Sequence, residues 1–149
     1  MKYELRKLDS NTVKELIELS KKWQDEECSW GIIANTDEDL KEPVFVAIDN
    51  DNIVGYIFGH YYIVENKTSY IEIGKKCFMI DEIYVLPIYR SKGIGKDLFK
   101  LMETHIKETC DYLTLSTSTK NYKSILHFYV DELDMNFHSA FLIKEMWGY

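Results

Sequence analysis

The chain contains few prolines, glycines and cysteines. Its 149 residues include only two prolines, seven glycines and three cysteines, against 14% aromatic residues. This composition excludes a collagen-like, low-complexity or disordered chain. Cys28, Cys77 and Cys110 are widely spaced and form no C-x-x-C motif. We therefore expect neither a disulfide framework nor a zinc site, but reduced thiols in a cytoplasmic protein.

Long apolar runs and positive charge are also in short supply. No run approaches the ~18 residues of a membrane helix, and no apolar signal region follows Met1, so neither a membrane span nor secretion is expected. There are 18 Lys and Arg against 25 Asp and Glu, a net charge of −7. An acidic surface repels nucleic acid and anionic membranes, so neither is an expected partner. It suits a cationic partner, although many proteins are acidic merely for solubility.

The length favours one domain over residues 1–149. Helical spacing predicts helices at 13–23, 94–106 and 122–133, with a short capped helix near 35–39. Ser10 or Thr12 can cap the first helix, and Thr12-x-x-Glu15 matches a capping box. Apolar or alternating runs predict strands at 2–8, 44–48, 53–64, 78–86, 112–117 and 135–147, with further pairing near 70–73.

The predicted element order is β-α-(α)-β-β-β-α-β-α-β. The strand–helix–strand unit over 79–117 requires a right-handed crossover and hence a parallel pair of strands, whereas the earlier hairpins are antiparallel. The sequence therefore predicts an α/β (α+β) fold: a mixed, mostly antiparallel central sheet with helices on both faces.

The most informative segment, residues 85–96, joins a predicted strand to a predicted helix. Gly93 and Gly95 remove side chains where a ligand could approach the backbone. The first N–H groups of a helix lack internal partners and lie at its positive end, which favours a phosphate. Arg90, Lys92 and Lys96 add positive charge in an otherwise acidic protein.

Two common phosphate-binding motifs do not fit this loop. A dinucleotide fingerprint needs a third glycine where Leu98 stands. A P-loop needs a glycine at Arg90 and a hydroxyl residue at Asp97. By itself, the loop is compatible with a plain turn between a strand and a helix.

The stretch Arg90-Ser91-Lys92-Gly93-Ile94-Gly95 resembles the R/Q-x-x-G-x-G/A motif of the GCN5-related N-acetyltransferase (GNAT) family. The flanks, Ile80–Pro87 and Leu98, also match, and the element order agrees over essentially the whole chain. The helix predicted at 122–133 departs from the family pattern. The family usually places a tyrosine seven residues after an asparagine, whereas Tyr129 lies eight after Asn121.

The resemblance implies acetyl-CoA as acyl donor and no metal. Backbone amides of the loop would hold the cofactor pyrophosphate. The pantetheine arm would pair with the preceding strand, beside the strand at 112–117. A backbone N–H near Val85 or Leu86 would polarise the thioester carbonyl. The cofactor-binding residues implied are Ile83, Tyr84, Val85, Arg90, Ser91, Lys92, Gly93, Ile94, Gly95, Lys96 and Asn121.

The resemblance also implies an acid and a base. Glu82 is the candidate base for the acceptor ammonium, acting through water; a structural carboxylate is the equal alternative. Its neighbour Asp81 should point to the opposite face of the strand unless a bulge intervenes. Tyr129 is the candidate acid for the leaving thiolate, with a core tyrosine as the alternative. For His60, on the neighbouring strand, a structural role is favoured over contact with the substrate.

The acceptor implied is the primary amine of a small, cationic molecule. The acidic runs at 25–27 and 37–39, flanked by Trp23 and Trp30, would suit a cationic amine, although most of these charges fit a solvated helix end. Amines of proteins or peptides are an alternative acceptor.

The sequence is also compatible with two functions besides catalysis of acetyl transfer: a noncatalytic acyl-CoA sensor and a different nucleotide-binding protein. The resemblance is also compatible with a homodimer, because many relatives dimerise through C-terminal strands. Trp147 and Tyr149 would suit that contact, or packing onto the chain's own sheet.

Overall fold

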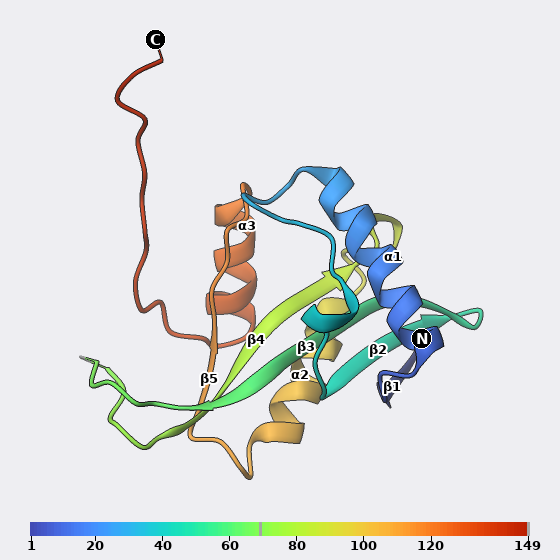
Figure 1. Ribbon diagram of the computed structural model, residues 1–149, viewed down its shortest axis with the longest axis horizontal. Coiled ribbons are helices and arrows are strands. Elements are labelled where there is room, and N and C mark those ends of the chain that lie inside the picture. The colour runs from blue at the N-terminus through green and yellow to red at the C-terminus, as the bar shows by residue number, and fades with distance from the viewer. Residues whose placement is uncertain (69, 149) are drawn as a thin grey trace.

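The computed structural model describes residues 1–148 except Ser69. Its five-stranded sheet has the order β1-β2-β3-β4-β5 (Figure 1). The strands are β1 (Lys2–Arg6), β2 (Val44–Asp49), β3 (Asn52–Ile63), β4 (Lys76–Val85) and β5 (Tyr112–Leu115). The first four pair antiparallel in sequence order, and β4 pairs parallel with β5. The mixed, mostly antiparallel sheet predicted from the sequence is confirmed.

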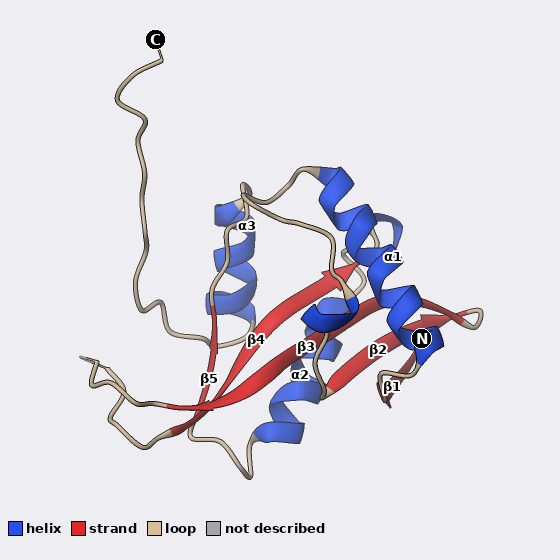
Figure 2. Cartoon of the chain, in the orientation of Figure 1, coloured by secondary structure: helices blue, strands red, loops and turns tan. Residues whose placement is uncertain are grey.

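Helices cover both faces of this sheet, as Figure 2 shows. On one face lies α1 (Ser10–Glu26), whose Leu16 and Leu19 pack with residues of β2, β3 and β4. On the other lies α2 (Ile94–Ile106), whose Leu98, Phe99 and Met102 are completely buried. The chain thus has two apolar cores separated by the sheet.

Several predicted boundaries shift in the structure. The first helix begins at Ser10, because the Asp9 side chain accepts a hydrogen bond from the Thr12 N–H at 2.8 Å. The expected capping box at Thr12 is therefore wrong, and Glu15 instead accepts from the Ile53 N–H. A capping box does occur at Thr36, ahead of a 3₁₀ turn at Asp37–Asp39. Residues 70–73 form no strand.

The last predicted helix is divided into two forms. An α-helical part, α3 (Tyr122–Leu126), continues into a π-helical turn, His127–Glu132. The π-type bond from the Leu133 N–H to the Phe128 carbonyl, five residues earlier, measures 3.1 Å. Tyr129 and Leu133 from this segment join the core on the α2 face.

The strand predicted at 135–147 is wrong. Within the described residues, the segment after Asp134 forms no strand and runs away from the domain (Figure 1). A strand needs a neighbouring strand to pair with, and no described strand pairs with residues 135–148. Its Phe141, Leu142 and Ile143 are each more than 85% exposed. The expected contact of Tyr149 lies outside the described residues.

The described helices include none that is long and apolar enough to cross a membrane. The three cysteines are free thiols.

Gly59 occupies a tightly constrained position in the sheet. Phe58 pairs with Glu82, but Gly59 pairs with Ile80, so Asp81 is an extra residue in β4 and forms a β-bulge. A Cβ on Gly59 would overlap the Met79 carbonyl oxygen and lie 2.7 Å from Cε1 of Phe78. The bulge brings the backbone of β4 so close that only glycine fits opposite it.

We expect Gly59→Ala to lower the free energy of unfolding by about 1–3 kcal/mol, because β4 must shift to admit the methyl group. Urea unfolding at neutral pH measures this change. Gly95→Ala is the matched control: its Cβ would meet only Phe128 Cζ, at 3.5 Å, and alanine favours a helix. Equal stability of the Gly59→Ala variant and the parent would contradict the tight packing.

Candidate active site

The sheet opens at the end of β4. Pairing between β4 and β5 runs from Cys77 opposite Tyr112 to Ile80 opposite Leu115 and stops there, while β4 continues to Val85. The edge of β4 beyond Ile80 therefore has no neighbouring strand on that side. The sequence-based expectation of a free strand edge beside 112–117 matches this geometry.

Backbone hydrogen bonding decides which groups face the opening. The Leu86 N–H donates to the Val54 carbonyl on β3 at 2.9 Å, so it is not free to polarise a thioester. Because backbone groups alternate sides along a strand, those of Val85 and Ile83 face the opening, and those of Tyr84 face β3. Of the two donors expected, Val85 and Leu86, only Val85 is available.

The first turn of α2 presents unused donors. Gly93 precedes the helix with φ +84°, which favours glycine, and a Cβ at this position would meet no atom within 4 Å. The helical ladder starts with the Asp97 N–H donating to the Gly93 carbonyl at 3.0 Å. In the described chain, the N–H groups from Gly93 to Lys96 have no acceptor. Four such groups at the positive end of a 13-residue helix fit a pyrophosphate.

The three basic residues of the loop differ in how they are used. The Arg90 guanidinium is bound to Glu26, at the end of α1, through two hydrogen bonds of 2.7 and 2.9 Å. Lys92 places its Nζ 5.6 Å from the centre of the Tyr89 ring. Lys96 is exposed in the first turn of α2. The Arg90 side chain is thus engaged elsewhere, contrary to the expectation that it adds free positive charge to the loop.

The bulge at Asp81 changes the face on which the carboxylates lie. Before it, Phe78 and Ile80 face the α2 core; after it, Ile83 and Val85 do. Asp81 and Glu82 therefore both lie on the α1 face. The expectation that they point to opposite faces is wrong, because the extra residue resets the alternation of the strand.

Glu82 is held by one of its two oxygens. Its Oε1 accepts hydrogen bonds from the Tyr56 hydroxyl at 2.7 Å and from Asn35 Nδ2 at 2.9 Å. Its Oε2 has no partner among the described residues. Burial raises the pKa of Glu82 above its usual value, and the nearby Asp81 and Asp39 raise it further, against the lowering effect of the two hydrogen bonds. A fixed carboxylate with a raised pKa and a free oxygen suits a general base.

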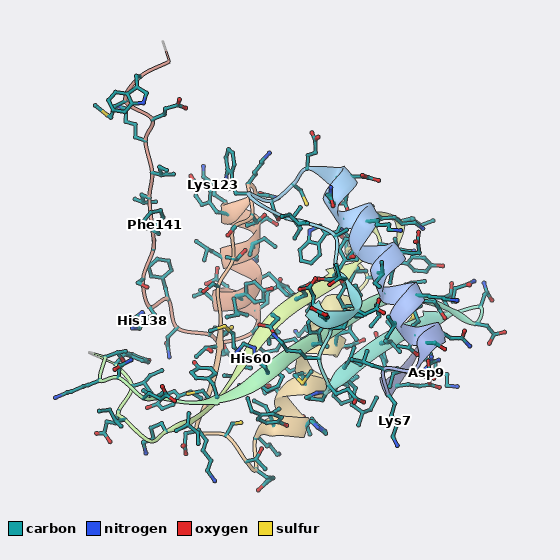
Figure 3. The ribbon with its side chains drawn as sticks, viewed as in Figure 1. Lys7, Asp9, His60, Lys123, His138 and Phe141 are labelled. Atoms are coloured by element: carbon teal, nitrogen blue, oxygen red, sulfur yellow. The ribbon has the colours of Figure 1, made fainter. Side chains whose placement is uncertain are left out.

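Asp81 lies between two basic side chains. Its carboxylate is 2.9 Å from His60 Nδ1 and 3.4 Å from Lys41 Nζ. Figure 3 shows His60 on β3, projecting from the sheet near the point where β4 and β5 diverge. His60 is thus tied to the neighbour of Glu82, a contact in keeping with the favoured structural role.

Tyr129 lies inside the π-helical turn, His127–Glu132. It is buried at 8% exposure, although it lies eight residues after Asn121 and the family pattern has seven.

The phenol of Tyr129 lies in apolar surroundings. Its ring packs 5.2 Å from that of Phe128 and 6.4 Å from that of Phe99, centre to centre. Its hydroxyl forms no hydrogen bond with the described residues. Burial alone raises its pKa to about 12, so the hydroxyl holds its proton at neutral pH. Tyr129 lies on the α2 face of the sheet and Glu82 on the α1 face.

The remaining predicted residues lie outside the strand edge itself. Asn121 precedes α3 and is exposed, and its side chain makes no capping bond. Trp23 does not face a ligand but stacks on Tyr84, with ring centres 5.2 Å apart. Trp30 is 70% exposed and carries Lys120 over its ring at 4.7 Å.

Three residues that hold other residues of the candidate site in place were not identified from the sequence. Asn35 and Tyr56 hold Glu82, and Glu26 holds Arg90. Tyr56 is two residues from the partner of Glu82 in the β3–β4 register, a signal available only once the register is known. Among residues 1–68 and 70–148, no group of three or more His, Cys, Asp and Glu side chains is placed to hold a metal ion.

Comparisons with known proteins agree with this architecture. The family model described as the acetyltransferase (GNAT) family matches residues 8–133. A predicted acetyltransferase from Clostridium acetobutylicum, solved with acetyl-CoA, superimposes with a TM-score of 0.66 at 18% identity, covering 97% of each chain. A ribosomal-protein-alanine N-acetyltransferase from Brucella melitensis biovar Abortus 2308 gives 0.64 at 18%, covering 97% of this chain and all of that one.

An aminoglycoside antibiotic 6′-N-acetyltransferase from Acinetobacter haemolyticus also gives a TM-score of 0.64, at 15% identity over the whole of both chains. Comparison with curated proteins returns no match. At these identities the solved structures establish the fold, and the family model establishes the family. The chain belongs to the GNAT family of acetyltransferases.

The raised pKa of Glu82 makes a prediction about stability. A raised pKa in the folded state means that ionised Glu82 costs folding free energy at pH 7, and that this cost disappears as the pH falls below the unfolded-state pKa. Glu82→Gln keeps an acceptor for Tyr56 and Asn35 but cannot ionise. We expect this variant to be more stable than the parent at pH 7, with the difference shrinking toward pH 4.

Urea unfolding of both proteins at the two pH values measures this effect. Exposed Glu108 provides the control, since Glu108→Gln should change stability little at either pH. A Glu82→Gln variant whose advantage grows toward pH 4 would show that the buried carboxylate is not destabilising when ionised.

Proposed function

We propose that the chain is an acetyl-CoA-dependent N-acetyltransferase that acetylates the primary amine of a small, cationic molecule. The observation that carries this proposal is the set of four free N–H groups at the start of α2, next to a strand edge left unpaired by the parting of β4 and β5. This combination suits a ligand with a pyrophosphate at one end and an extended, amide-bearing arm at the other. All 149 residues serve as one domain in this proposal.

Different residues bind the pyrophosphate, pair with the pantetheine arm and polarise the thioester. The N–H groups of residues 93–96 hold the pyrophosphate, and Ile83 and Val85 pair with the pantetheine arm. The Val85 N–H donates to the thioester oxygen as negative charge develops there, a contribution typically of ~2.7–4 kcal/mol. Arg90, Ser91 and Lys92 shape the loop, and Asn121, which is exposed just before α3, is assigned to cofactor binding from the family resemblance.

Proton transfers complete the reaction. Glu82 accepts a proton from the acceptor ammonium through a bridging water, which gives a neutral amine. The amine nitrogen bonds to the thioester carbon as the carbon–sulfur bond breaks. Tyr129 donates its hydroxyl proton to the departing thiolate. The new amide nitrogen releases its extra proton, which returns through solvent to the Tyr129 phenolate, and Glu82 loses its proton to solvent. The two residues approach the opening from opposite faces, so the amine and the thiol need not compete for one side.

The acceptor is inferred from charge on the α1 face. Asp81 and Glu82 lie side by side there, and Asp39 is close enough to raise the pKa of Glu82. An ammonium group would relieve this repulsion. Protein or peptide amines are the alternative acceptor, and a noncatalytic acyl-CoA sensor is the alternative function. The free cysteines and the net charge of −7 suit a cytoplasmic enzyme.

The deciding experiment follows free-thiol release from acetyl-CoA against polyamines, aminoglycosides, amino acids and short peptides. We expect turnover with a cationic small-molecule class. Tyr129→Phe should then lower turnover at least about tenfold, because the thiolate loses its proton donor, while CoA affinity changes little. Calorimetric titration with CoA measures that affinity.

Tyr61→Phe is the control, since Tyr61 is half exposed and packs on Phe78 away from the free end of β4. CoA binding without turnover by any amine would favour the sensor. Tighter binding of ATP or NAD than of CoA would indicate a different nucleotide-binding protein. Unchanged turnover in Tyr129→Phe would remove this residue from the mechanism.

We also propose a homodimer formed through the C-terminal tail. The tail exposes Phe137, Phe141, Leu142, Ile143, Met146 and Trp147 to solvent, and such a run of apolar side chains is rarely left uncovered. Figure 3 shows Phe141 well separated from the domain. Sedimentation velocity at micromolar concentration should give a dimer for the parent and a monomer for Phe141→Glu/Ile143→Glu. A monomeric parent would contradict the dimer and favour packing of the tail on its own sheet.

A further inference from the structure

Glu26, the last residue of α1, is bound to two residues of the candidate cofactor site. Its Oε1 accepts from Arg90 Nη1 at 2.7 Å, and its Oε2 accepts from Arg90 Nη2 at 2.9 Å and from the Tyr84 hydroxyl at 2.6 Å. The side chain of Glu26 is 20% exposed. Both carboxylate oxygens are therefore used, and this residue is not part of a solvated acidic helix end.

Three of the five N–H donors of Arg90 are already used within the chain. Besides the paired bonds to Glu26, its Nε donates to the Val85 carbonyl at 2.8 Å, and its guanidinium lies over the Tyr84 ring, 5.4 Å from the ring centre. The paired geometry matches the planar fork of a guanidinium to the two oxygens of a carboxylate. Its charge is largely balanced by Glu26.

The pair joins three parts of the molecule. Glu26 ends α1, Val85 ends β4, and Arg90 opens the loop that leads to the free N–H groups of α2. The next residue, Ser91, has φ +61°, an uncommon conformation for a residue other than glycine. A loop that contains such a residue needs surrounding contacts to keep its shape.

We propose that Glu26 and Arg90 are positioning residues that hold the loop at 91–96 in the shape that binds CoA, and that the Arg90 side chain is not itself a phosphate ligand. This inference rests on the proposed function, since it assigns a role within the same cofactor site. It also gives the end of α1 a role in CoA binding, although Glu26 lies 64 residues before Arg90 in the sequence.

Arg90 could act by attracting phosphate through its charge or by holding the shape of the loop, and these two roles predict opposite CoA affinities for the same variants. If Arg90 attracts phosphate by its charge, Arg90→Lys should keep most of the CoA affinity, and Glu26→Gln should leave it unchanged or tighten it. If Arg90 acts through shape, a lysine cannot reproduce the paired bonds or the bond to Val85, so it should fail. Removing Glu26 should then be as harmful as removing Arg90.

The test is calorimetric titration of CoA into the full chain and into Arg90→Lys, Arg90→Gln, Glu26→Gln and the double variant Glu26→Gln/Arg90→Gln. We expect each single variant to weaken CoA binding by about tenfold, within the range measured for coupled neighbours. The double variant should bind no more weakly than either glutamine variant alone, because both substitutions break one unit. Circular dichroism before each titration confirms that the protein is folded.

The exposed pair Lys100–Glu103 on α2, at 3.3 Å, provides the matched control. Lys100→Gln and Glu103→Gln change the same charges without touching the loop, so CoA affinity should stay within about twofold. Parent-like affinity in Arg90→Lys or Glu26→Gln, or losses that multiply in the double variant, would overturn the proposal while leaving the acetyltransferase function intact. A parent that does not bind CoA would overturn both.

Discussion

The bulge at Asp81 is the constraint on which the site depends. One extra residue in β4 resets which side chains face α1, increases the local twist, and follows directly on Ile80, the last residue of β4 that pairs with β5. Without it, Glu82 would point into the α2 core, where a carboxylate is costly to bury. With it, Glu82 reaches Tyr56 and Asn35 on the α1 face, and Val85 presents its N–H to an unpaired edge. Gly59 makes this geometry possible because it has no side chain to collide with the bulge.

A second local irregularity, a π-helical turn, lies on the α2 face of the sheet. The π-helical turn at His127–Glu132 adds a residue without rotating the residues that follow it. Tyr129 lies inside this turn, beside Phe99 and Phe128, in surroundings apolar enough to raise its pKa to about 12. Glu82 therefore owes its orientation to a β-bulge, and Tyr129 lies in a π turn that packs on the opposite face of the sheet.

These departures explain where prediction from the sequence succeeds and where it stops. The loop at 90–96 could be recognised because its chemistry is carried by consecutive residues. The faces of Asp81 and Glu82 could not, because alternation is a rule for unbroken strands, and the bulge is visible only in the pairing of two strands. Tyr56 and Asn35 lie 26 and 47 residues from Glu82, so no local pattern connects them. The tail after Asp134 has the composition of a strand, but a strand also needs a partner, which composition cannot supply.

The distribution of charge around the loop follows from the same contacts. In a chain with a net charge of −7, the three basic residues at 90–96 would suggest a cation-rich phosphate site. Glu26 balances the charge of Arg90, so in the proposed site the attraction for a pyrophosphate would come from the four N–H groups at the start of α2, with Lys92 and Lys96. Backbone dipoles fixed by a helix need no side-chain ordering when a ligand arrives, whereas a long basic side chain loses rotamer freedom. In the proposed site, Arg90 therefore holds the loop in place, and CoA binding depends on the fixed orientation of the N–H groups of α2 more than on net charge.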